Sequence, residues 1–231
     1  MKYLGLDITN EQSFAPIADE KSIRIVPTKK GFQFTRHWFT SRNQSTWSTF
    51  LPQKFSNTQP VNMIQIGVFE GMDLVWCLQN ILAHSSSRVV AIDPWLATEK
   101  LDAQFMKECQ DRAIYNLQPW EGKVLIVPHT SSEELPKLHG ARTIRGKRIK
   151  EGEWDLIVID GDHNAPVVYE DAKHAIDLVC IGGWIVFDDV RNKTPKVNHV
   201  KQGLEQFLGE FGQRVKLVWA HRFSNCYERI S

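Results

Sequence analysis

The chain has 231 residues, of which 42% are hydrophobic and 24% are charged. This composition is typical of a folded globular protein, and the length fits one large domain. The 28 basic residues nearly balance the 27 acidic ones. The composition therefore excludes an overall basic charge that would favour binding to nucleic acid or to an anionic membrane.

Three further features indicate the compartment. The four cysteines are far apart and form no CxxC pair, which argues against structural zinc and a disulfide framework and favours a reducing environment. The N-terminal sequence MKYLGLDITNEQ is a poor signal peptide because Asp7 and Glu11 interrupt it early. The sequence has no apolar stretch of about 18 residues that would cross a membrane. We expect a cytoplasmic protein with no membrane partner.

The first 60 residues differ from the rest because they do not alternate between strand and helix patterns. Aromatic residues gather at 34–39 and around Trp47. We expect residues 1–60 to form a cap segment that packs on a core domain of residues 61–231, with these aromatic side chains as anchors. His37 is a candidate for the mouth of a substrate site.

From residue 61 onward, short apolar runs alternate with segments of helical periodicity. We predict strands at residues 61–66, 88–92, 124–127, 154–159, 184–187, 215–219 and 226–230. We predict helices at residues 71–83, 99–117, 165–179 and 195–211, and a short helix with its N-cap at Ser131 or Ser132. Gly182 and Gly183 are expected to stop the helix before them, and Pro195 to lie in the first turn of the last helix.

This alternation predicts an α/β fold of the Rossmann-like type. Apolar strands indicate a seven-stranded, mostly parallel sheet with helices on both faces, and the closely spaced last two strands predict one antiparallel strand near the C-terminus. The basic run at residues 142–150 is expected to be a solvated loop, as such runs usually are. We therefore expect no nucleic-acid partner, and the sequence leaves the oligomeric state open, including a homo-oligomer.

A glycine-containing turn follows the first predicted strand. Its sequence, QIGVFEG at residues 65–71, has two glycines in GxxxG spacing, which let the backbone turn sharply and let a ligand approach the main chain. It lacks the GxGxxG spacing of dinucleotide-binding folds. Asp93 ends the next strand, where a carboxylate can accept both hydroxyls of a ribose. The alternative for the two glycines is a plain strand-to-helix turn. The alternative for Asp93 is a turn residue before Pro94.

Acidic residues directly follow two later strands, as DGDH at residues 160–163 and DD at residues 188–189. The carboxyl ends of neighbouring parallel strands meet at one edge of a sheet. Three carboxylates at such an edge suit a hard divalent cation, and a histidine beside them suits proton transfer at neutral pH. The two clusters therefore predict a site for a divalent cation at this edge of the sheet, with a histidine close enough to act as a base.

Alternatives stay open for this cluster. One alternative is that Asp162 or Asn164 only caps the helix that follows the DGDH segment. Asp162 is also a second candidate for the base. Two adjacent aspartates point in different directions, so one ion that binds both Asp188 and Asp189 requires a turn in the backbone.

In chain order, the segments QIGVFEG, VVAIDPW, VPHTSSEELPKL, WDLIVIDGDH and GGWIVFDDV resemble class I S-adenosylmethionine-dependent methyltransferases. Within that class they are similar to small-molecule O-methyltransferases with an IDGxH motif, of the metal-dependent catechol and macrolide-sugar type. The resemblance spans about residues 30–230.

The resemblance implies S-adenosylmethionine as the cofactor. The residues implied to bind it are Gln65, Gly67, Phe69, Glu70 and Gly71 at the methionyl part, Asp93 at the ribose, and Trp95, Ser131 and Ser132 at the adenine. Two positions depart from the family pattern. Gln65 replaces an acid, which weakens its contact with the cofactor ammonium, and Asp73 stands where a serine or threonine is usual.

The resemblance also implies the chemistry. Asp160, Asp188 and Asp189 would hold Mg²⁺, and His163 would be the base, so that Asp160 and His163 are the candidate catalytic residues. A bound Mg²⁺ lowers the pKa of a hydroxyl and fixes its line of attack on a methyl group. The predicted function is an S-adenosylmethionine-dependent, Mg²⁺-assisted O-methyltransferase that acts on a hydroxylated small molecule, such as a sugar or a diol.

Two other functions stay open. One is an NAD-dependent oxidoreductase on a Rossmann sheet, although the missing third glycine of the turn counts against it. The other is a catalytically inactive binding protein with the methyltransferase fold, which the departures at Gln65 and Asp73 keep under consideration.

Overall fold

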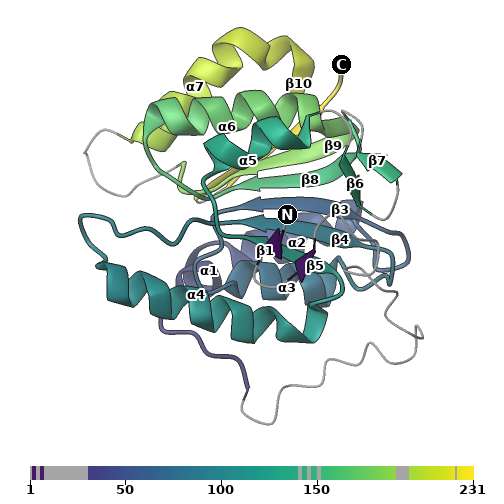
Figure 1. Cartoon of the computed structure of the whole chain (residues 1–231). Helices are drawn as coiled ribbons and strands as arrows, with labels where there is room; N and C mark the ends of the chain where they lie inside the picture. The colour runs from purple at the N-terminus through teal and green to yellow at the C-terminus, as the bar shows by residue number, and fades with distance from the viewer. Residues whose placement is uncertain are drawn as a thin grey trace. The chain divides into compact units, whose positions relative to one another are not determined.

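The fold is seen in a computed structural model that describes residues 2–3, 6–7, 31–139, 142–144, 147–149, 152–190, 198–221 and 223–231 (Figure 1). Its main sheet has seven strands in the order β10-β11-β9-β8-β3-β4-β5. The strands β3 and β8, β8 and β9, and β4 and β5 pair in parallel, whereas β11 is antiparallel to both β9 and β10. This confirms the predicted Rossmann-like sheet with one antiparallel strand near the C-terminus.

The chain divides into two compact units, of which the first comprises Met1–Val61 and Val68–His129. Its strands are β1 (Lys2–Tyr3), β2 (Leu6–Asp7), β4 (Arg88–Ile92) and β5 (Val124–Val127). Its helices are α1 (Trp38–Arg42), α2 (Gln44–Lys54), α3 (Met72–Asn80), α4 (Ala103–Leu117) and the 3₁₀ turn η3 (Gln118–Trp120).

Aromatic side chains join the N-terminal helices to α3 in this first unit. Trp47 on α2 is 1% exposed, and its ring centroid lies 5.1 Å from that of Phe39 and 6.2 Å from that of Trp76 on α3. Burying such rings contributes about 1.5–3 kcal/mol each. The anchoring role that the sequence predicts for the aromatic residues at 34–50 agrees with this packing, and the domain boundary at residue 60 stays a prediction.

The second unit comprises Asn62–Gly67 and Thr130–Ser231. Its strands are β3 (Asn62–Ile66), β6 (Arg142–Ile144), β7 (Lys147–Ile149), β8 (Trp154–Ile159), β9 (Val179–Phe187), β10 (Val215–His221) and β11 (Ser224–Arg229). Its helices are α5 (Ser131–Leu138), α6 (Ala165–Leu178), α7 (His199–Phe211) and the 3₁₀ turn η4 (Gly212–Arg214). Figure 1 shows α6 between α5 and α7, with which it packs.

The register of three neighbouring strands positions the acidic residues. Ile66 of β3 pairs with Ile159 of β8, and Ile159 pairs with Phe187 of β9. The three strands therefore end level with one another. As a result, Gly67, Asp160 and Asp188 follow the strand ends side by side, as the sequence predicts for a parallel sheet.

Several helix ends differ from the prediction. The helix α4 begins at Ala103, four residues later than expected, because the Asp102 side chain caps it by accepting from Phe105 N at 2.8 Å. The helix α7 begins at His199 with Asn198 as its N-cap, and the predicted start at Pro195 lies outside the described residues. The prediction that α3 continues to residue 83 is wrong, because it ends at Asn80.

Two glycines do not stop a helix as expected. The helix α6 ends at Leu178, and β9 starts at the next residue and runs through Gly182 and Gly183. A Cβ at Gly183 would lie 2.7 Å from Val179 Cγ2 and 2.9 Å from Cys180 Sγ. The missing side chain at Gly183 therefore allows close packing inside a strand, a role that a glycine pair does not reveal in the sequence.

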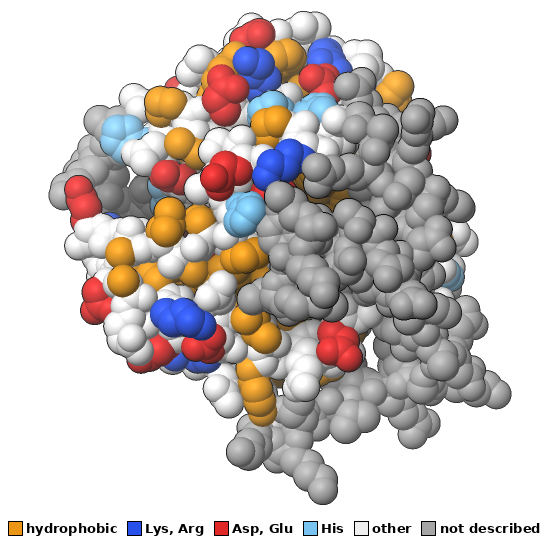
Figure 2. All heavy atoms as spheres, viewed as in Figure 1, with side chains coloured by type: hydrophobic (Ala, Val, Ile, Leu, Met, Phe, Trp, Pro, Cys, Tyr) orange, Lys and Arg blue, Asp and Glu red, His pale blue; other side chains and the backbone are white. Residues whose placement is uncertain are grey.

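The basic run at residues 142–150 is not a plain loop. Its backbone forms the antiparallel pair β6 and β7, in which Arg142 pairs with Ile149 and Ile144 with Lys147. On the face seen in Figure 2, basic and acidic side chains are interspersed, in line with the balanced composition. No helix within the described residues is both long enough and apolar enough to span a membrane.

Candidate functional site

The turn after β3 requires a glycine at residue 67. Gly67 has a φ of +81°, and a Cβ there would lie only 1.9 Å from the backbone oxygen of Asp160. Gln65, which is fully buried, donates from Nε2 to Gly67 O at 2.9 Å. In this structure the glycine therefore permits the close approach of two turns of the protein itself, and the Gln65 amide fixes the shape of the turn.

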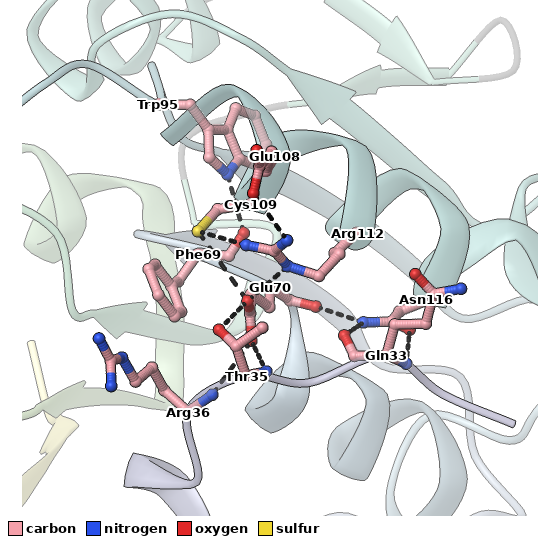
Figure 3. A network of polar contacts seen from close by, with 10 residues as sticks. All are labelled: Gln33, Thr35, Arg36, Phe69, Glu70, Trp95, Glu108, Cys109, Arg112 and Asn116. Atoms are coloured by element: carbon pink, nitrogen blue, oxygen red, sulfur yellow. Dashed lines mark hydrogen bonds and ion pairs between the residues drawn. The ribbon is translucent and has the colours of Figure 1, made fainter. Parts of the chain in front are cut away.

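The rest of this turn lies in the first unit, where Asp93 organises it. Asp93 Oδ2 accepts from Val68 N at 2.8 Å and from Phe69 N at 2.9 Å, and Oδ1 accepts from Trp95 N at 2.7 Å. The Trp95 ring closes the arrangement by donating from Nε1 to Phe69 O at 2.8 Å (Figure 3). Asp93 and Trp95 thus hold the backbone at Phe69 in place.

Asp93 keeps limited capacity for a ligand. Its carboxyl group is buried, and burial raises its pKa above the ordinary value, although the three amide hydrogen bonds act in the opposite direction. A carboxylate has about four lone-pair positions. Three of them are used by the amides of Val68, Phe69 and Trp95, which leaves about one for a ribose hydroxyl.

Glu70, the next polar residue of the turn, binds the N-terminal segment. Its side chain is 1% exposed and pairs with Arg112 of α4, whose Nε lies 2.6 Å from Oε1. It also accepts from Thr35 N and Thr35 Oγ1, both at 2.6 Å, and from Arg36 N at 3.4 Å (Figure 3). This carboxylate is therefore occupied by donors of the protein and connects residues 35–36 to the glycine turn.

Asn116 completes the same network. Its Nδ2 donates to the backbone oxygens of Gln33 and Glu70, both at 2.9 Å, and its Oδ1 accepts from Gln33 N at 2.7 Å. Gly71, which follows Glu70 in the chain, has a φ of +78° and is the N-cap of α3. In the first turn of that helix, Asp73 accepts from Leu74 N at 2.8 Å.

The two serines expected near the adenine begin α5 in the second unit. The N-cap is Thr130, which forms a capping box with Glu133, so the predicted N-cap at Ser131 or Ser132 is wrong by one or two residues. Ser131 is buried and Ser132 is exposed, with Ser132 Oγ 3.0 Å from Thr130 Oγ1. The two hydroxyls therefore have different surroundings although they are adjacent in sequence.

Three of the predicted metal and base residues come together in the second unit. Asp160, His163 and Asp189 each offer a ligand atom, and these atoms lie within 4.8 Å of one another. His163 Nε2 lies 3.7 Å from Asp189 Oδ2. The backbone oxygen of Asp189 also accepts from Asn198 Nδ2 at 3.1 Å, so the N-cap of α7 holds the turn after β9.

Two neighbouring acids lie outside this group. Asp188 is buried, and its backbone amide donates to Ile159 O at 3.0 Å, whereas its side chain does not belong to the three-residue group. Asp162 Oδ1 accepts from Asn164 N at 2.8 Å and from Asn164 Nδ2 at 2.7 Å. Asp162 thus serves the turn that leads into α6. The N-cap of α6 is Asn164, and no side chain makes a capping hydrogen bond there, so the predicted capping role of these side chains is wrong.

Backbone strain marks both halves of the candidate site. Among the described residues, the non-glycine residues with left-handed backbone are Phe69 at a φ of +52°, Trp95 at +46° and Asp189 at +53°. Such conformations cost on the order of 1–3 kcal/mol each and cluster at functional sites. All three are residues that the sequence analysis proposes for cofactor or metal binding.

Comparisons with known proteins agree with this fold. Residues 64–190 match the family model described as "Methyltransferase domain". A putative O-methyltransferase from Klebsiella pneumoniae is similar in structure, with a TM-score of 0.56, 19% sequence identity and 81% of each chain covered. An O-methyltransferase from Bacillus cereus in complex with SAH has a TM-score of 0.50 and 21% identity, with 74% of each chain covered.

A third similar structure is a putative rRNA-methylase from Clostridium thermocellum, with a TM-score of 0.53 and 13% identity, covering 82% of this chain and 97% of the other. A search among curated proteins found no match. At identities this low, the structural likeness establishes the fold and leaves the methyl acceptor open.

Replacing Asp93 with alanine is expected to destabilise the protein. The change leaves two buried amides and one partly buried amide without their acceptor, at about 1–3 kcal/mol for each group that finds no replacement. We expect a loss of about 3 kcal/mol in the free energy of unfolding, measured with urea. Asp93→Asn keeps one acceptor oxygen and should lose less. Wild-type stability in Asp93→Ala would contradict the role assigned to this carboxylate.

Replacing Glu70 with alanine is expected to release the N-terminal segment. Arg112, 16% exposed, loses its buried counter-charge, which costs about 3–5 kcal/mol. The matched control is Glu108→Ala, because Glu108 is half-exposed and 3.5 Å from the same arginine, and its loss should cost less than about 1 kcal/mol. Urea unfolding measures stability, and limited proteolysis should cut near Thr35 only in the Glu70 variant. Equal effects of the two changes would refute the anchoring role.

Proposed function

The chain belongs to the methyltransferase-domain family, and we propose that it transfers the methyl group of S-adenosylmethionine to a hydroxyl of a small molecule. The observation that carries this proposal is the extent of the family match. The matched residues, 64–190, begin within β3 and end directly after Asp189. They include every residue proposed here for the cofactor, the metal and the base.

The cofactor supplies a methyl group activated by a sulfonium charge, and the chain supplies its binding site. We propose that the main chain of the turn at Gly67, Phe69 and Gly71 holds the methionyl part. Gln65 and Glu70 act through this backbone, since their side chains hold the turn and the N-terminal segment. The remaining contacts proposed are Asp93 with the ribose and Trp95, Ser131 and Ser132 with the adenine. The SAH complex of the similar Bacillus cereus enzyme supports this choice of cofactor.

A divalent cation fits the group formed by Asp160, His163 and Asp189. Two carboxylates and an imidazole within 4.8 Å are a donor set for a first-row dication or for Mg²⁺. The imidazole favours Mn²⁺ over Mg²⁺, because Mg²⁺ prefers oxygen ligands. When bound, the cation would supply positive charge that lowers the pKa of a coordinated hydroxyl. Asp188 is proposed as a further ligand only if its buried side chain turns towards this group.

His163 is a candidate for either of two roles, general base or metal ligand. Its ring is 56% exposed and its Nε2 faces Asp189 Oδ2 at 3.7 Å. As a base it would take the proton of the acceptor hydroxyl, and Asp189 would stabilise the imidazolium that results. As a ligand it would give the lone pair of a ring nitrogen to the cation, and that nitrogen could not take a proton at the same time. We propose the base role when three carboxylates hold the cation, and the ligand role when two do.

The acceptor is proposed to be a hydroxylated small molecule, such as a sugar or a diol. The acidic group at the end of β8 and β9 supports this class, because adjacent hydroxyls are good partners for a carboxylate-bound dication. An NAD-dependent oxidoreductase is disfavoured by the family match and by the glycine spacing of the turn.

Cofactor binding tests the proposal directly. We expect S-adenosylmethionine and S-adenosylhomocysteine to bind with micromolar dissociation constants in calorimetry, and NAD to give no heat. Formation of S-adenosylhomocysteine should then depend on an added catechol or sugar acceptor. If neither sulfur ligand binds, the proposal fails. Binding without transfer to a broad panel of acceptors would favour the inactive binding protein.

Metal binding is tested by titration with Mn²⁺ alone. Asp160→Asn and Asp189→Asn should each weaken Mn²⁺ affinity by at least about 10-fold, because each removes a charged ligand. Asp162→Asn is the matched control and should leave the affinity unchanged, since Asp162 lies outside the group. Asp188→Asn distinguishes the two ligand sets. It should weaken Mn²⁺ affinity if three carboxylates hold the ion, and leave it unchanged if His163 is a ligand in place of Asp188. Equal Mn²⁺ affinity in all variants, or full turnover in EDTA, would remove the cation from the proposal.

A further inference from the structure

Two histidines meet where the C-terminal end of α5 packs against α6. His139 is the C-cap of α5, and His174 lies on α6, which is in contact with α5 (Figure 1). His139 Nε2 lies 3.0 Å from His174 Nδ1, and the two ring centroids are 5.0 Å apart. Both residues are partly exposed, and neither belongs to the group formed by Asp160, His163 and Asp189. The C-terminal end of a helix carries partial negative charge, which favours a cation there.

The distance between the two nitrogens matches one kind of metal centre. Metal–imidazole bonds are about 2.1 Å long, so nitrogens at neighbouring positions of a square-planar or octahedral centre are about 3.0 Å apart, whereas a tetrahedral centre separates them by about 3.4 Å. The observed 3.0 Å agrees with the first geometry. Square-planar and tetragonal centres are typical of Cu²⁺ and Ni²⁺, whereas Zn²⁺ prefers a tetrahedral centre.

The protonation of the pair also suits a metal ion. Burial is the main cause that lowers the pKa of His174 below its ordinary value, and the neighbouring His139 acts in the same direction. The neutral imidazole, which this favours, is the form that binds metals. In the present contact, one of the two facing nitrogens carries a proton and the other accepts it. A change of tautomer moves that proton to the far nitrogen of its own ring, so both lone pairs become available and no proton has to leave the protein.

A carboxylate lies close to the pair along α6. Glu170 precedes His174 by four residues, so both lie on the same face of the helix. Glu170 pairs with Lys173 at 3.6 Å, and both of these side chains are exposed, so the pairing is weak and the carboxylate can turn to a bound ion. Asp177 follows on the same helix and is held by Arg214 at 3.0 Å. Glu170 and Asp177 act to raise the pKa of His174, and Lys173 acts to lower it.

We propose that His139 and His174 form a binding site for a transition-metal dication of the Ni²⁺ or Cu²⁺ type. The two imidazole nitrogens occupy neighbouring positions of the centre, Glu170 adds negative charge, and water completes the coordination. The bound ion joins the C-terminal end of α5 to α6. Imidazole ligands select such ions over Mg²⁺ and Mn²⁺, which prefer oxygen, so this site and the acidic group at Asp160 differ in the metal that they take. The inference does not depend on the proposed function.

Titration with Ni²⁺ alone tests the site. The full chain carries His163→Asn throughout, so that the acidic group lacks its imidazole. In this background we expect one Ni²⁺ to bind, and His139→Asn and His174→Asn should each weaken the affinity by at least about 10-fold, because each removes one of two imidazole ligands. The matched control is His199→Asn, because His199 is an exposed histidine on α7 and lies outside the pair. It should leave the affinity unchanged.

Two results of this titration would overturn the proposal. The first is equal Ni²⁺ affinity in the His139, His174 and His199 variants, because the pair would then not hold the ion. The second is the absence of Ni²⁺ binding as soon as His163 is replaced, because the ion would then belong to the acidic group.

A spectroscopic readout keeps the proposal open to refutation if a variant of the pair fails to fold. The chain with only His163→Asn is given one equivalent of Cu²⁺, and electron paramagnetic resonance counts the nitrogens bound to the ion. Two coordinated nitrogens are expected, and one or none would contradict the site. Saturating Ni²⁺ should also raise the midpoint of thermal unfolding of this chain, because an ion that binds the folded state stabilises it. An unchanged midpoint would contradict the joining of α5 to α6.

Discussion

The contact between the turn after β3 and the turn after β8 is the constraint on which the candidate site depends. A Cβ at residue 67 would overlap the backbone oxygen of Asp160 at 1.9 Å, so only glycine allows both turns to follow strands that end level with each other. Asp160 therefore stands where its position is set by main-chain packing. A rigid scaffold of this kind places a functional group more accurately than a free loop does.

Two acidic residues of the first unit show how the fold itself shapes a ligand-binding motif. Asp93 and Glu70 lie in the turn region that resembles a cofactor site, yet both are engaged by the chain itself. Asp93 gathers three amides around Phe69, and Glu70 fixes the N-terminal segment through Thr35 and Arg112. Their main physical effect is to hold the backbone in a strained shape, which is a form of preorganisation for ligand binding.

The sequence predicts the sheet well because apolar runs are local signals. The bounds of β4, β5 and β8 agree with the prediction residue for residue. The strand β11 is antiparallel as predicted, but it runs Ser224–Arg229 instead of 226–230. The partner of Glu70 could not be predicted, since Arg112 is 42 residues away and no local pattern links them. The sequence also does not reveal whether Asp188 or Asp189 joins the group with Asp160 and His163, because this depends on the left-handed backbone of Asp189. That conformation is set by the turn and by Asn198.

Two of the buried acids in the first unit are compensated in different ways. Glu70 has an arginine, and Asp93 has three amides. An acid that serves only the fold is expected to have full compensation, because an unpaired oxygen in a dry interior is costly. Glu70 and Asp93 meet that expectation. Full compensation by the protein's own donors therefore explains how both acids stay buried beside the glycine turn.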